Sequence, residues 1–474
     1  MSEYNMIIDG KKVITDKAFN VLNPATEEVV APCPQAGPEH LDQAVAAAQR
    51  AFASWSQLDD AVHKQKVREI ADVLEAHTEE LARILTEEQG KPLKGFAGLG
   101  AGFEVGGAVA WCRATAELDL PVEVIQDNDE VRIEVHRKPL GVVASITPWN
   151  YPLMIAIWHV MPAIRAGNTV VLKPSSFTPL ATLRFVELAN EILPPGVLNI
   201  VTGEGGMGRQ ITGHPGINKI VFTGSTPTGK NIMQNAAGTL KRLTLELGGN
   251  DAAVVLSDVD PKAIAPKIFA TSFINSGQTC AALKRLYVHE DIYEEMCSAL
   301  TEIAKSVTLG NGLEDGVDFG PVQNKAQFDL VCELAEDAKK TGARFLIGGE
   351  PTAGKGYFFP ITLVADITDG ARLVDEEPFG PILPIIKFTD VDDAIRRANN
   401  SPNGLGGSVW SDDIDKAKQL AARLECGTAW INHHAILQPN APFGGVKESG
   451  FGVEFGHYGL EEYTNIQTMH IYKS

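Results

Sequence analysis

The sequence has few cysteines, and none of them form a spaced pair. Six are spread over 474 residues without a C-x-x-C motif: Cys33, Cys112, Cys280, Cys297, Cys332 and Cys426. Secreted disulfide frameworks are denser and more regular in cysteine, so this spacing predicts a reducing, cytoplasmic location. The first residues, Met-Ser-Glu-Tyr-Asn-Met, also lack the basic start and apolar core of a signal peptide.

Long apolar runs and basic charge are scarce as well. The most apolar stretch, residues 142–166, is interrupted by three prolines and by Asn150, His159 and Arg165, which argues against a membrane span. Lys and Arg number 41 against 60 Asp and Glu, giving a formal net charge of −19. Such a surface repels phosphate backbones and anionic lipid, so neither nucleic acid nor membrane is expected as a partner.

What is present is the composition of a folded globular protein, with 44% apolar and 21% charged residues. At roughly 150 residues per domain, the length suggests about three units. No residue cluster indicates a metal site, and we predict none.

The first third of the chain is predicted to be helical and then to form a hairpin. Within residues 38–90, apolar residues recur at the spacing of one helix face: Leu41, Ala44, Val45, Ala48 and Phe52. Between 119 and 139 the pattern alternates with period two around the turn at 127–129, which predicts a β-hairpin. We expect this hairpin and the β-rich segment 464–472 to supply edge strands that pair with another subunit.

The middle of the chain alternates between short β-branched runs and helix-length segments. The runs cover residues 141–146, 169–172, 198–201, 219–222 and 252–256. This alternation predicts βαβ units and a buried parallel sheet. A second α/β block is predicted from about 257 to 450, with strands at 285–288 and 383–387; Pro384 favours an edge position or a strand start for the latter.

Two glycine-rich loops each match part of a nucleotide-binding motif. Residues 203–208 spell G-x-G-x-x-G after a predicted strand, but no Asp or Glu follows until Glu246, so the dinucleotide fingerprint is incomplete and a plain turn is favoured. Residues 224–230 have the P-loop spacing, with Asn231 where magnesium binding needs Ser or Thr. Either loop can offer backbone N–H groups to a pyrophosphate, which indicates a nucleotide without saying which one.

Four Gly- or Pro-containing turns carry reactive or amide side chains. They lie at residues 148–152 (PWNYP), 246–250 (ELGGN), 277–280 (GQTC) and 377–381 (EPFGP). On these motifs the sequence resembles the aldehyde dehydrogenase superfamily from about Ile14 to the C-terminus, with 34 residues between Glu246 and Cys280. The resemblance implies NAD or NADP as cofactor and a small-molecule aldehyde as substrate. It also implies a homodimer or homotetramer.

The chemistry of aldehyde oxidation explains these residue types. A thiolate adds to the carbonyl, hydride then leaves to a nicotinamide, and water activated by a general base hydrolyses the thioester. By resemblance Cys280 is the nucleophile, Glu246 the base, and Asn150 the oxyanion donor together with the Cys280 backbone N–H. Glu454 resembles a second acid that relays protons toward Glu246. We expect a helix N-terminus to depress the thiol pKa of Cys280, and the other five cysteines to be small buried hydrophobes.

The resemblance also assigns contacts to the cofactor. Glu377 and Phe379 resemble the pair that holds the nicotinamide ribose and packs beside the ring, and Lys173 resembles an adenosine-ribose contact. The remaining predicted contacts are Trp149, Ser176, Gly224 and Ser225. Many NAD-preferring relatives carry Glu where this chain has Ser176; because that carboxylate would repel a 2′-phosphate, its absence predicts that NADP is accepted.

His159 is a second departure from the pattern of the resembled family, because relatives often have Lys eight to ten residues after the Asn. A Lys-dependent relay is therefore in doubt, and the plainer interpretation is a helix histidine bonded to a nearby backbone group.

The positions that match the substrate tunnel are mostly apolar: Tyr151, Met154, Ile155, Trp158, Ile274, Thr279, Leu437 and Phe443. No Arg is among them, which favours an apolar aliphatic or aromatic aldehyde, because a substrate carboxylate would be buried unpaired. A semialdehyde dehydrogenase and, more remotely, a P-loop nucleotide-binding protein are the alternatives; His433 and His434 could favour a polar group.

The expected fold is α/β, with a Rossmann-like cofactor domain, a second α/β catalytic domain and a small β oligomerisation element. The predicted cofactor domain covers 1–118 and 140–247, and the catalytic domain covers 248–449. The oligomerisation hairpin and C-terminal strand cover 119–139 and 450–474.

Overall fold

A computed structural model describes residues 4–473. The first three residues, at the start of the predicted cofactor domain and of the segment considered for a signal peptide, lie outside the described residues. So does Ser474, the last residue of the predicted C-terminal strand. Among the described residues, no helix combines the length and apolarity needed to cross a bilayer.

The first sheet has a core of five parallel strands in the order β9-β8-β7-β10-β11. Numbered along the chain this is 3-2-1-4-5, the order of a doubly wound nucleotide-binding fold. Their bounds are β7 (Val142–Ile146), β8 (Thr169–Lys173), β9 (Leu198–Ile200), β10 (Lys219–Thr223) and β11 (Arg242–Glu246). The antiparallel strands β1 (Met6–Ile8) and β2 (Lys11–Val13) extend one edge, and β21 (Gly450–Phe451) extends the other.

Helices cover both faces of this sheet, which explains why its strands read as continuous apolar runs. One face packs against α1 (Pro38–Trp55), α7 (Gly205–Gly213) and α8 (Thr226–Ala236). The other packs against α2 (Asp60–Ala76), α3 (Thr78–Gln89), α4 (Ala101–Glu117), α5 (Pro152–Arg165) and α6 (Leu180–Asn190). The helices predicted for 38–90 are confirmed as α1 to α3.

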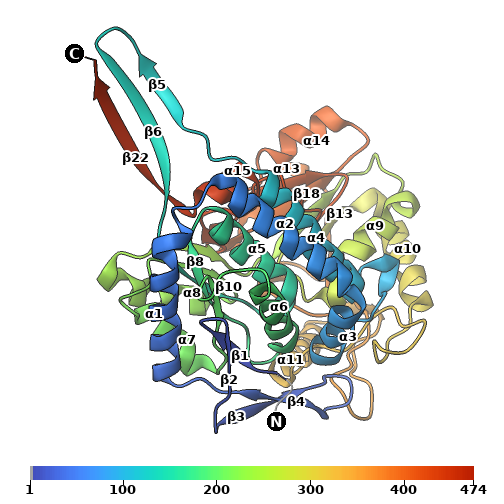
Figure 1. Cartoon of the computed structure of the whole chain (residues 1–474). Helices are drawn as coiled ribbons and strands as arrows, with labels where there is room; N and C mark the ends of the chain where they lie inside the picture. The colour runs from blue at the N-terminus through green and yellow to red at the C-terminus, as the bar shows by residue number, and fades with distance from the viewer. Residues whose placement is uncertain (1–3, 474) are drawn as a thin grey trace.

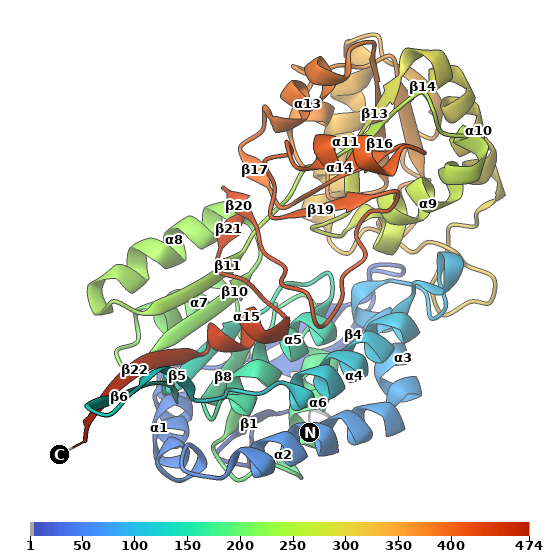
Figure 2. The same cartoon turned by 90° about the horizontal axis from the view of Figure 1, so that it is seen from above.

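The second sheet contains β14 (Arg344–Ile347), β15 (Thr362–Ala365), β16 (Ile382–Phe388), β13 (Leu283–His289), β12 (Asp251–Val255), β18 (Gly406–Trp410) and β19 (Thr428–Ile431), in that spatial order. All except β14 run parallel. One face is covered by α9 (Pro261–Phe273) and α10 (Tyr293–Ser306). The other is covered by α11 (Lys325–Lys340), α12 (Arg372–Asp375), α13 (Val391–Asn399) and α14 (Ile414–Ala421). Seen from above, the two sheets form separate layered bodies (Figure 2).

The prediction that Pro384 marks an edge or a strand start was wrong. Strand β16 lies inside the sheet between β15 and β13, and Pro384 is its third residue. The ladder to β15 ends at Pro384 and the ladder to β13 begins at Ile385. The missing N–H therefore falls where the strand passes from one neighbour to the other, at little cost in hydrogen bonds.

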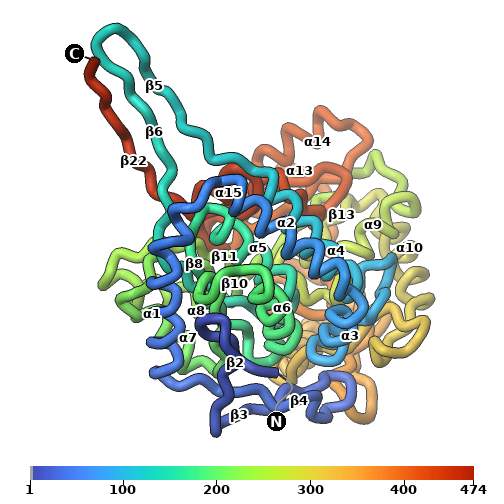
Figure 3. The backbone as a smooth tube through the Cα atoms, viewed as in Figure 1, coloured from blue at the N-terminus to red at the C-terminus, as the bar shows by residue number. Residues whose placement is uncertain are grey.

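A third sheet projects from the molecule. It consists of β5 (Glu123–Asp127), β6 (Val131–Pro139) and β22 (Thr464–Tyr472), with β6 in the centre (Figures 1 and 3). The predicted hairpin and the predicted strand at 464–472 are thus confirmed as strands. The short pairs β3 (Ala18–Leu22) with β4 (Val29–Pro34) and β17 (Asn403–Gly404) with β20 (Val446–Lys447), and helix α15 (Gly456–Glu461), complete the elements named here.

The mixed α/β class with parallel sheets is confirmed. The exact domain boundaries stay a prediction. The chain passes directly from Glu246 at the carboxyl end of β11 to Asp251 at the amino end of β12, so these ends of the two sheets lie next to each other.

Candidate active site

The predicted site residues gather where these two sheet edges meet. Asn150 follows β7, Lys173 ends β8, Ser225 follows β10, and Glu246 ends β11. From the second sheet, Cys280 precedes β13, and residues 377–379 precede β16. In doubly wound folds, ligands bind at the carboxyl ends where strand order reverses, which here is between β7 and β10.

The Cys280 loop is held in an unusual backbone conformation. The 3-10 segment η3 (Ile274–Gly277) contains Asn275, Ser276 and Gly277 with φ of 53°, 54° and 74°. A Cβ at position 277 would lie 2.1 Å from the Gly380 carbonyl oxygen, so only glycine fits there. Left-handed Asn and Ser cost roughly 1–3 kcal/mol each and persist only where surrounding contacts enforce them.

The predicted helix N-terminus at Cys280 does not exist, because the residue lies in an irregular segment between η3 and β13. The thiol is half-buried, and desolvation raises its pKa to about 12, with a smaller lowering effect from the Lys284 ammonium. The Lys284 Nζ donates to the Cys280 and Gly249 carbonyls and lies 2.7 Å from Glu377 Oε1. Among the other cysteines, Cys33, Cys112 and Cys297 are buried as predicted, whereas Cys332 and Cys426 are only half-buried.

Asn150 is buried against the cysteine loop. Its side-chain Nδ2 donates to the Gln278 carbonyl at 3.0 Å. Its own carbonyl accepts from Lys91 Nζ at 2.8 Å and from Asn275 Nδ2 at 3.0 Å. The structure therefore brings the predicted oxyanion donor next to the thiol loop, although 128 positions separate Asn150 from Gln278.

Glu246 and Glu454 form a buried acidic pair beside His159. Neither carboxylate oxygen of Glu246 has a hydrogen-bond partner among the described residues. Burial first, and then the Glu454 charge, raise the pKa of Glu246 well above its ordinary value. Glu454 Oε1 lies 3.1 Å from His159 Nε2.

The plain interpretation of His159, a bond to nearby backbone, was wrong. Its Nδ1 lies 2.9 Å from Ser145 Oγ and its Nε2 lies 3.0 Å from Thr223 Oγ1, and the side chain is fully buried. Both partners are side-chain hydroxyls of the adjoining strands β7 and β10. The ring is therefore fixed in orientation and faces Glu454.

The residues predicted to bind the cofactor offer free donors at the right strand ends. Lys173 Nζ donates to the Pro174 carbonyl at 3.0 Å, one of the three bonds an ammonium can make, and burial lowers its pKa to about 8. Ser176 is half-buried just after it. Ser225 is the N-cap of α8, with its Oγ 2.9 Å from Thr228 Oγ1, so the first N–H groups of α8 can meet a phosphate.

The aromatic part of this set is also assembled. Trp149 and Phe379 pack edge to face with ring centroids 5.3 Å apart. A Cβ at Gly224 would lie 2.4 Å from the Phe222 ring, so glycine is needed at that turn. Glu377 is not free, because it pairs with Lys284 and accepts from the Gly249 N–H at 3.2 Å. The donors at Lys173 and at the start of α8 suit the phosphate and ribose groups of a dinucleotide.

The P-loop alternative finds no support in the geometry. Lys230 points out of the loop and pairs with Glu448 at 2.8 Å, while Asn231 lies inside α8. The G-x-G-x-x-G loop forms the start of α7, with Glu204 as N-cap. No group of three or more His, Cys, Asp or Glu is placed to hold a metal ion among residues 4–473.

A pocket of about 770 Å³ reaches Cys280. Seven of the eight predicted tunnel residues line it, namely Tyr151, Met154, Ile155, Trp158, Ile274, Thr279 and Leu437. The eighth, Phe443, lies behind the lining and stacks on Phe455 with centroids 6.0 Å apart. His433 and His434 line the pocket as well.

Sequence reasoning missed one wall of this pocket, which comes from α4 and α9. The α4 residues are Phe103, Gly106, Gly107, Ala110 and Trp111, and α9 adds Lys267. The adjacent glycines in α4 could have indicated this wall. Each weakens a helix by about 1 kcal/mol relative to alanine, so a pair of them suggests a need for space beside the helix. Lys91, Asn275 and Lys284 were missed too, and no local motif marks them.

Fold and site together define a class: α/β proteins with two parallel-sheet units and a cysteine loop between them, next to a buried Asn and a buried acidic pair. Residues 12–469 match the aldehyde dehydrogenase family. The chain belongs to this family.

Individual relatives are similar over nearly their whole length. The phenylacetaldehyde dehydrogenase of Pseudomonas fluorescens is 39% identical, with 98% of this chain and 95% of that protein covered. The NAD+ complex of an aldehyde dehydrogenase from Bacillus cereus has a TM-score of 0.96 at 38% identity, covering 100% of this chain and 97% of that one. An NADP-dependent enzyme of E. coli has a TM-score of 0.96 at 35% identity, covering 100% and 98%.

Proposed function

We propose that this enzyme oxidises an apolar aliphatic or aromatic aldehyde to the carboxylic acid with NADP+ or NAD+, through a thiohemiacetal and then a thioester on Cys280. The observation that carries the proposal is the apolar pocket that ends at the Cys280 thiol. The reducing cytoplasm remains the proposed location, because Cys280 must stay a thiol and all six cysteines are free.

The residues divide the chemistry between them. Once the Cys280 thiol has lost its proton, the thiolate sulfur adds to the carbonyl carbon, and the oxygen, now negative, takes hydrogen bonds from the Asn150 amide and the Cys280 N–H. Glu377, Phe379 and Lys173 would hold the dinucleotide, and its nicotinamide would supply the hydride acceptor. Glu246 then removes a proton from the water that attacks the thioester, and Glu454 with His159 takes that proton onward. Because burial favours the neutral form of Glu246, this last step needs a pH high enough to ionise it.

The substrate class follows from the pocket lining. Aromatic and aliphatic side chains from α4, α5 and the 433–438 segment surround the cavity. The name of the 39% identical phenylacetaldehyde dehydrogenase agrees with an aromatic substrate. The semialdehyde alternative rests on Lys267, the one cation in the lining, which is exposed on α9.

Ser176 bears on the choice between NADP+ and NAD+. With no carboxylate at this position and the Lys173 ammonium nearby, a 2′-phosphate meets attraction and no repulsion. We predict that Ser176→Glu lowers kcat/KM for NADP+ at least tenfold while that for NAD+ holds or rises. Steady-state rates with both cofactors measure this. A variant with unchanged rates for both, and a wild type that scarcely uses NADP+, would refute the assignment.

Absorbance of the reduced nicotinamide, followed with both cofactors and hexanal, benzaldehyde, succinic semialdehyde and betaine aldehyde, tests the proposal as a whole. The apolar pair should give the higher kcat/KM, and Cys280→Ala should abolish turnover. A clear winner among the charged pair would overturn the substrate class. Turnover that survives Cys280→Ala would overturn the mechanism.

The projecting sheet is the proposed assembly element. Its outer strands β5 and β22 have open edges and exposed apolar residues, including Ile125, Ile466 and Tyr472. Open apolar edges favour pairing with another copy, so we propose a homodimer or homotetramer built through this sheet.

A further inference from the structure

We propose that Lys91 is a positioning residue for the reaction: together with Glu104 it clamps the backbone of Asn150 and thereby aims the oxyanion-binding amide. The inference rests on the proposed role of Asn150. Neither Lys91 nor Glu104 touches the thiol, and no reactive step is assigned to them.

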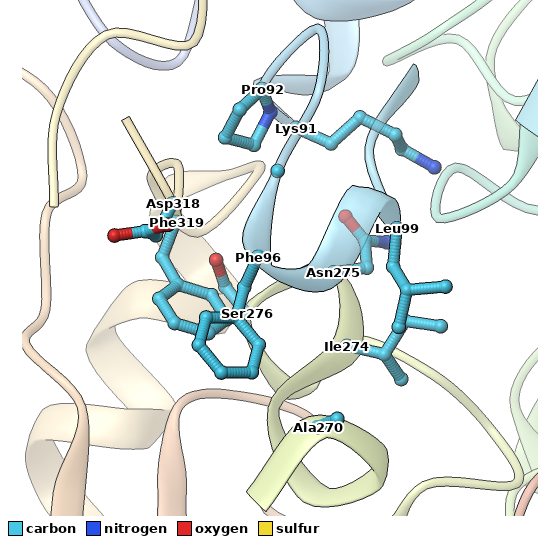
Figure 4. Close-up of a pocket in the computed structure, with 11 residues that line it drawn as sticks. Lys91, Pro92, Phe96, Leu99, Ala270, Ile274, Asn275, Ser276, Asp318 and Phe319 are labelled. Atoms are coloured by element: carbon cyan, nitrogen blue, oxygen red, sulfur yellow. The ribbon is translucent and has the colours of Figure 1, made fainter. Parts of the chain in front are cut away.

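Lys91 lies just after α3 and sends its side chain into the protein. The ammonium is 1% exposed, and it pairs with the fully buried carboxylate of Glu104. It also donates to the Asn150 carbonyl at 2.8 Å and lies 3.8 Å from the centre of the Tyr151 ring. Figure 4 shows the Lys91 side chain extended, with its ammonium far from its own backbone; Asn275 is among the other residues that line the same small cavity.

Glu104 completes the clamp from the other side. While one carboxylate oxygen holds Lys91, the other accepts from the backbone N–H groups of Leu153 at 3.0 Å and Met154 at 3.2 Å. These are in the first turn of α5, whose orphan N–H groups need an acceptor. The ion pair therefore forms hydrogen bonds at the start of the 150–152 turn, through Lys91, and just after its end, through Glu104.

A second donor reinforces the same carbonyl. Asn275 Nδ2 reaches the Asn150 oxygen at 3.0 Å from a residue held in the left-handed region. With its carbonyl fixed by two donors, Asn150 is left with its side-chain amide directed at the cysteine loop.

A buried ion pair usually adds little to the free energy of unfolding, so the presence of the Lys91–Glu104 pair here suggests a role other than stability. Desolvating an ammonium and a carboxylate costs about as much as their attraction returns, and an apolar pair of equal volume commonly does as well. The contacts that an apolar pair could not replace are those to the Asn150 carbonyl and to the start of α5. Both sets of contacts hold the turn that carries Asn150.

The test is a double-mutant cycle on kcat. Lys91→Gln with Glu104→Gln removes both charges together, so no lone charge stays buried. We expect kcat to fall roughly 10- to 100-fold, as for a misplaced donor and less than the roughly 100- to 1,000-fold of a lost one, with KM and cofactor affinity held within about twofold. In an Asn150→Ala background, the same pair of changes should cost almost nothing further, because the group being aimed is gone.

The matched control is Arg397→Gln with Asp369→Asn, which neutralises a partly buried ion pair in the second α/β unit. It should leave kcat unchanged in both backgrounds. Equal losses from Lys91→Gln/Glu104→Gln in both backgrounds would mean a general structural role, and no loss in the wild-type background would mean no role; either overturns the inference. If Asn150→Ala itself keeps full kcat, the proposed role of Asn150 as oxyanion donor is wrong. That result is distinct from the results that overturn the role of Lys91.

Lys91→Arg covers the case in which the double variant does not fold. The charge is kept, but a guanidinium is larger than an ammonium and directs its donors in a fixed planar fork, so it does not reproduce the position of the Lys91 ammonium between Tyr151 and the Asn150 carbonyl. A smaller fall in kcat that disappears in the Asn150→Ala background supports the inference, and a fall that persists there contradicts it.

Discussion

Lys284 places a positive charge behind the loop that carries Cys280. Its ammonium bonds to the Cys280 carbonyl and is the largest influence lowering a thiol pKa that burial raises. Lys284→Met removes that influence, so the thiol pKa rises and less thiolate is present at any given pH. We expect alkylation of Cys280 by iodoacetamide to slow about tenfold near pH 8, with its pH profile displaced to higher pH.

Mass spectrometry of the Cys280 peptide separates this thiol from the other five. Lys284→Arg keeps the charge and should keep the profile close to that of the wild type. An unchanged profile in Lys284→Met would show that the ammonium serves only its contacts with Glu377 and with the Cys280 and Gly249 carbonyls.

Glu454 adds a like charge beside Glu246, the proposed general base. Burial and this charge both raise the pKa of Glu246, so Glu454→Gln removes the second cause and lowers that pKa. We predict that the acid limb of acyl-enzyme hydrolysis moves to lower pH, with the plateau rate falling a few-fold because the next proton acceptor is lost. The deacylation rate after reaction with p-nitrophenyl acetate, followed from pH 5 to 9, gives the profile.

Glu454→Asp keeps the charge and is the comparison. Its acid limb should stay near that of the wild type. A limb that moves to higher pH in Glu454→Gln would show that Glu454 helps to ionise Glu246 through His159, the reverse of simple repulsion.

Single residues were predictable where the signal is local. Cys280, Glu246 and Asn150 each lie in a short motif whose residue types the chemistry demands. Lys91 and Asn275 act on the Asn150 carbonyl from positions 59 and 125 residues away. Nothing in a local window records such a contact, because it exists only once the two sheet units have met.

At the scale of elements, helix α4 carries two glycines on the wall of the pocket. A Cβ at Gly106 would meet nothing within 4 Å, whereas one at Gly107 would lie 2.7 Å from Met154 Sδ. Gly106→Ala should therefore stabilise the helix by about 1 kcal/mol with kcat/KM for hexanal unchanged. Thermal unfolding followed by fluorescence measures the gain.

Gly107→Ala is the matched comparison in the same helix. Its methyl group must displace the Met154 sulfur, so it should gain less stability and alter kcat/KM for ring-bearing aldehydes. Equal effects at the two positions would mean that the pocket wall does not depend on Gly107.

Elements were predictable from periodicity, with one instructive exception. Continuous β-branched runs correctly indicated buried parallel strands such as β7 and β8. The prediction from Pro384 was wrong, because the lack of an N–H group excludes only one hydrogen bond. It does not say to which neighbouring strand, or at which position along the strand, that bond would have been made. That information lies in the register, which the sequence does not reveal.

At the scale of the whole molecule, the projecting sheet should decide the assembly. Replacing Ile125 and Ile466, both more than half exposed on its outer strands, with Asp puts charge on both edges. We expect light scattering to give a mass near the 50.9 kDa of one chain, in place of two or four times that value for the wild type.

Leu240→Asp is the control for this change. Leu240 is 90% exposed but lies between α8 and β11, on the body of the first unit. Its substitution should leave the mass unchanged. A wild-type mass of one chain would remove the proposed role of the sheet.

The overall architecture was predictable because alternating strand and helix patterns leave few topologies open. These sequence patterns do not predict that the chain returns from the second α/β unit to the first. Strand β21 adds to β11 through the pairs Leu245–Phe451 and Glu246–Gly450, and Figure 2 shows it beside the first sheet.

This return has a consequence for the order of folding. The parallel core from β7 to β11 can form from contacts between neighbouring segments, but β11 then remains an open edge with Glu246 at its end. Its outer neighbour arrives from about 200 positions further along the chain, after the second unit has taken shape, and such distant contacts form late. We therefore expect the strand that bears Glu246, the proposed general base, to be secured late, so that a half-folded molecule would have its thiol loop and this base on parts that have not yet been joined.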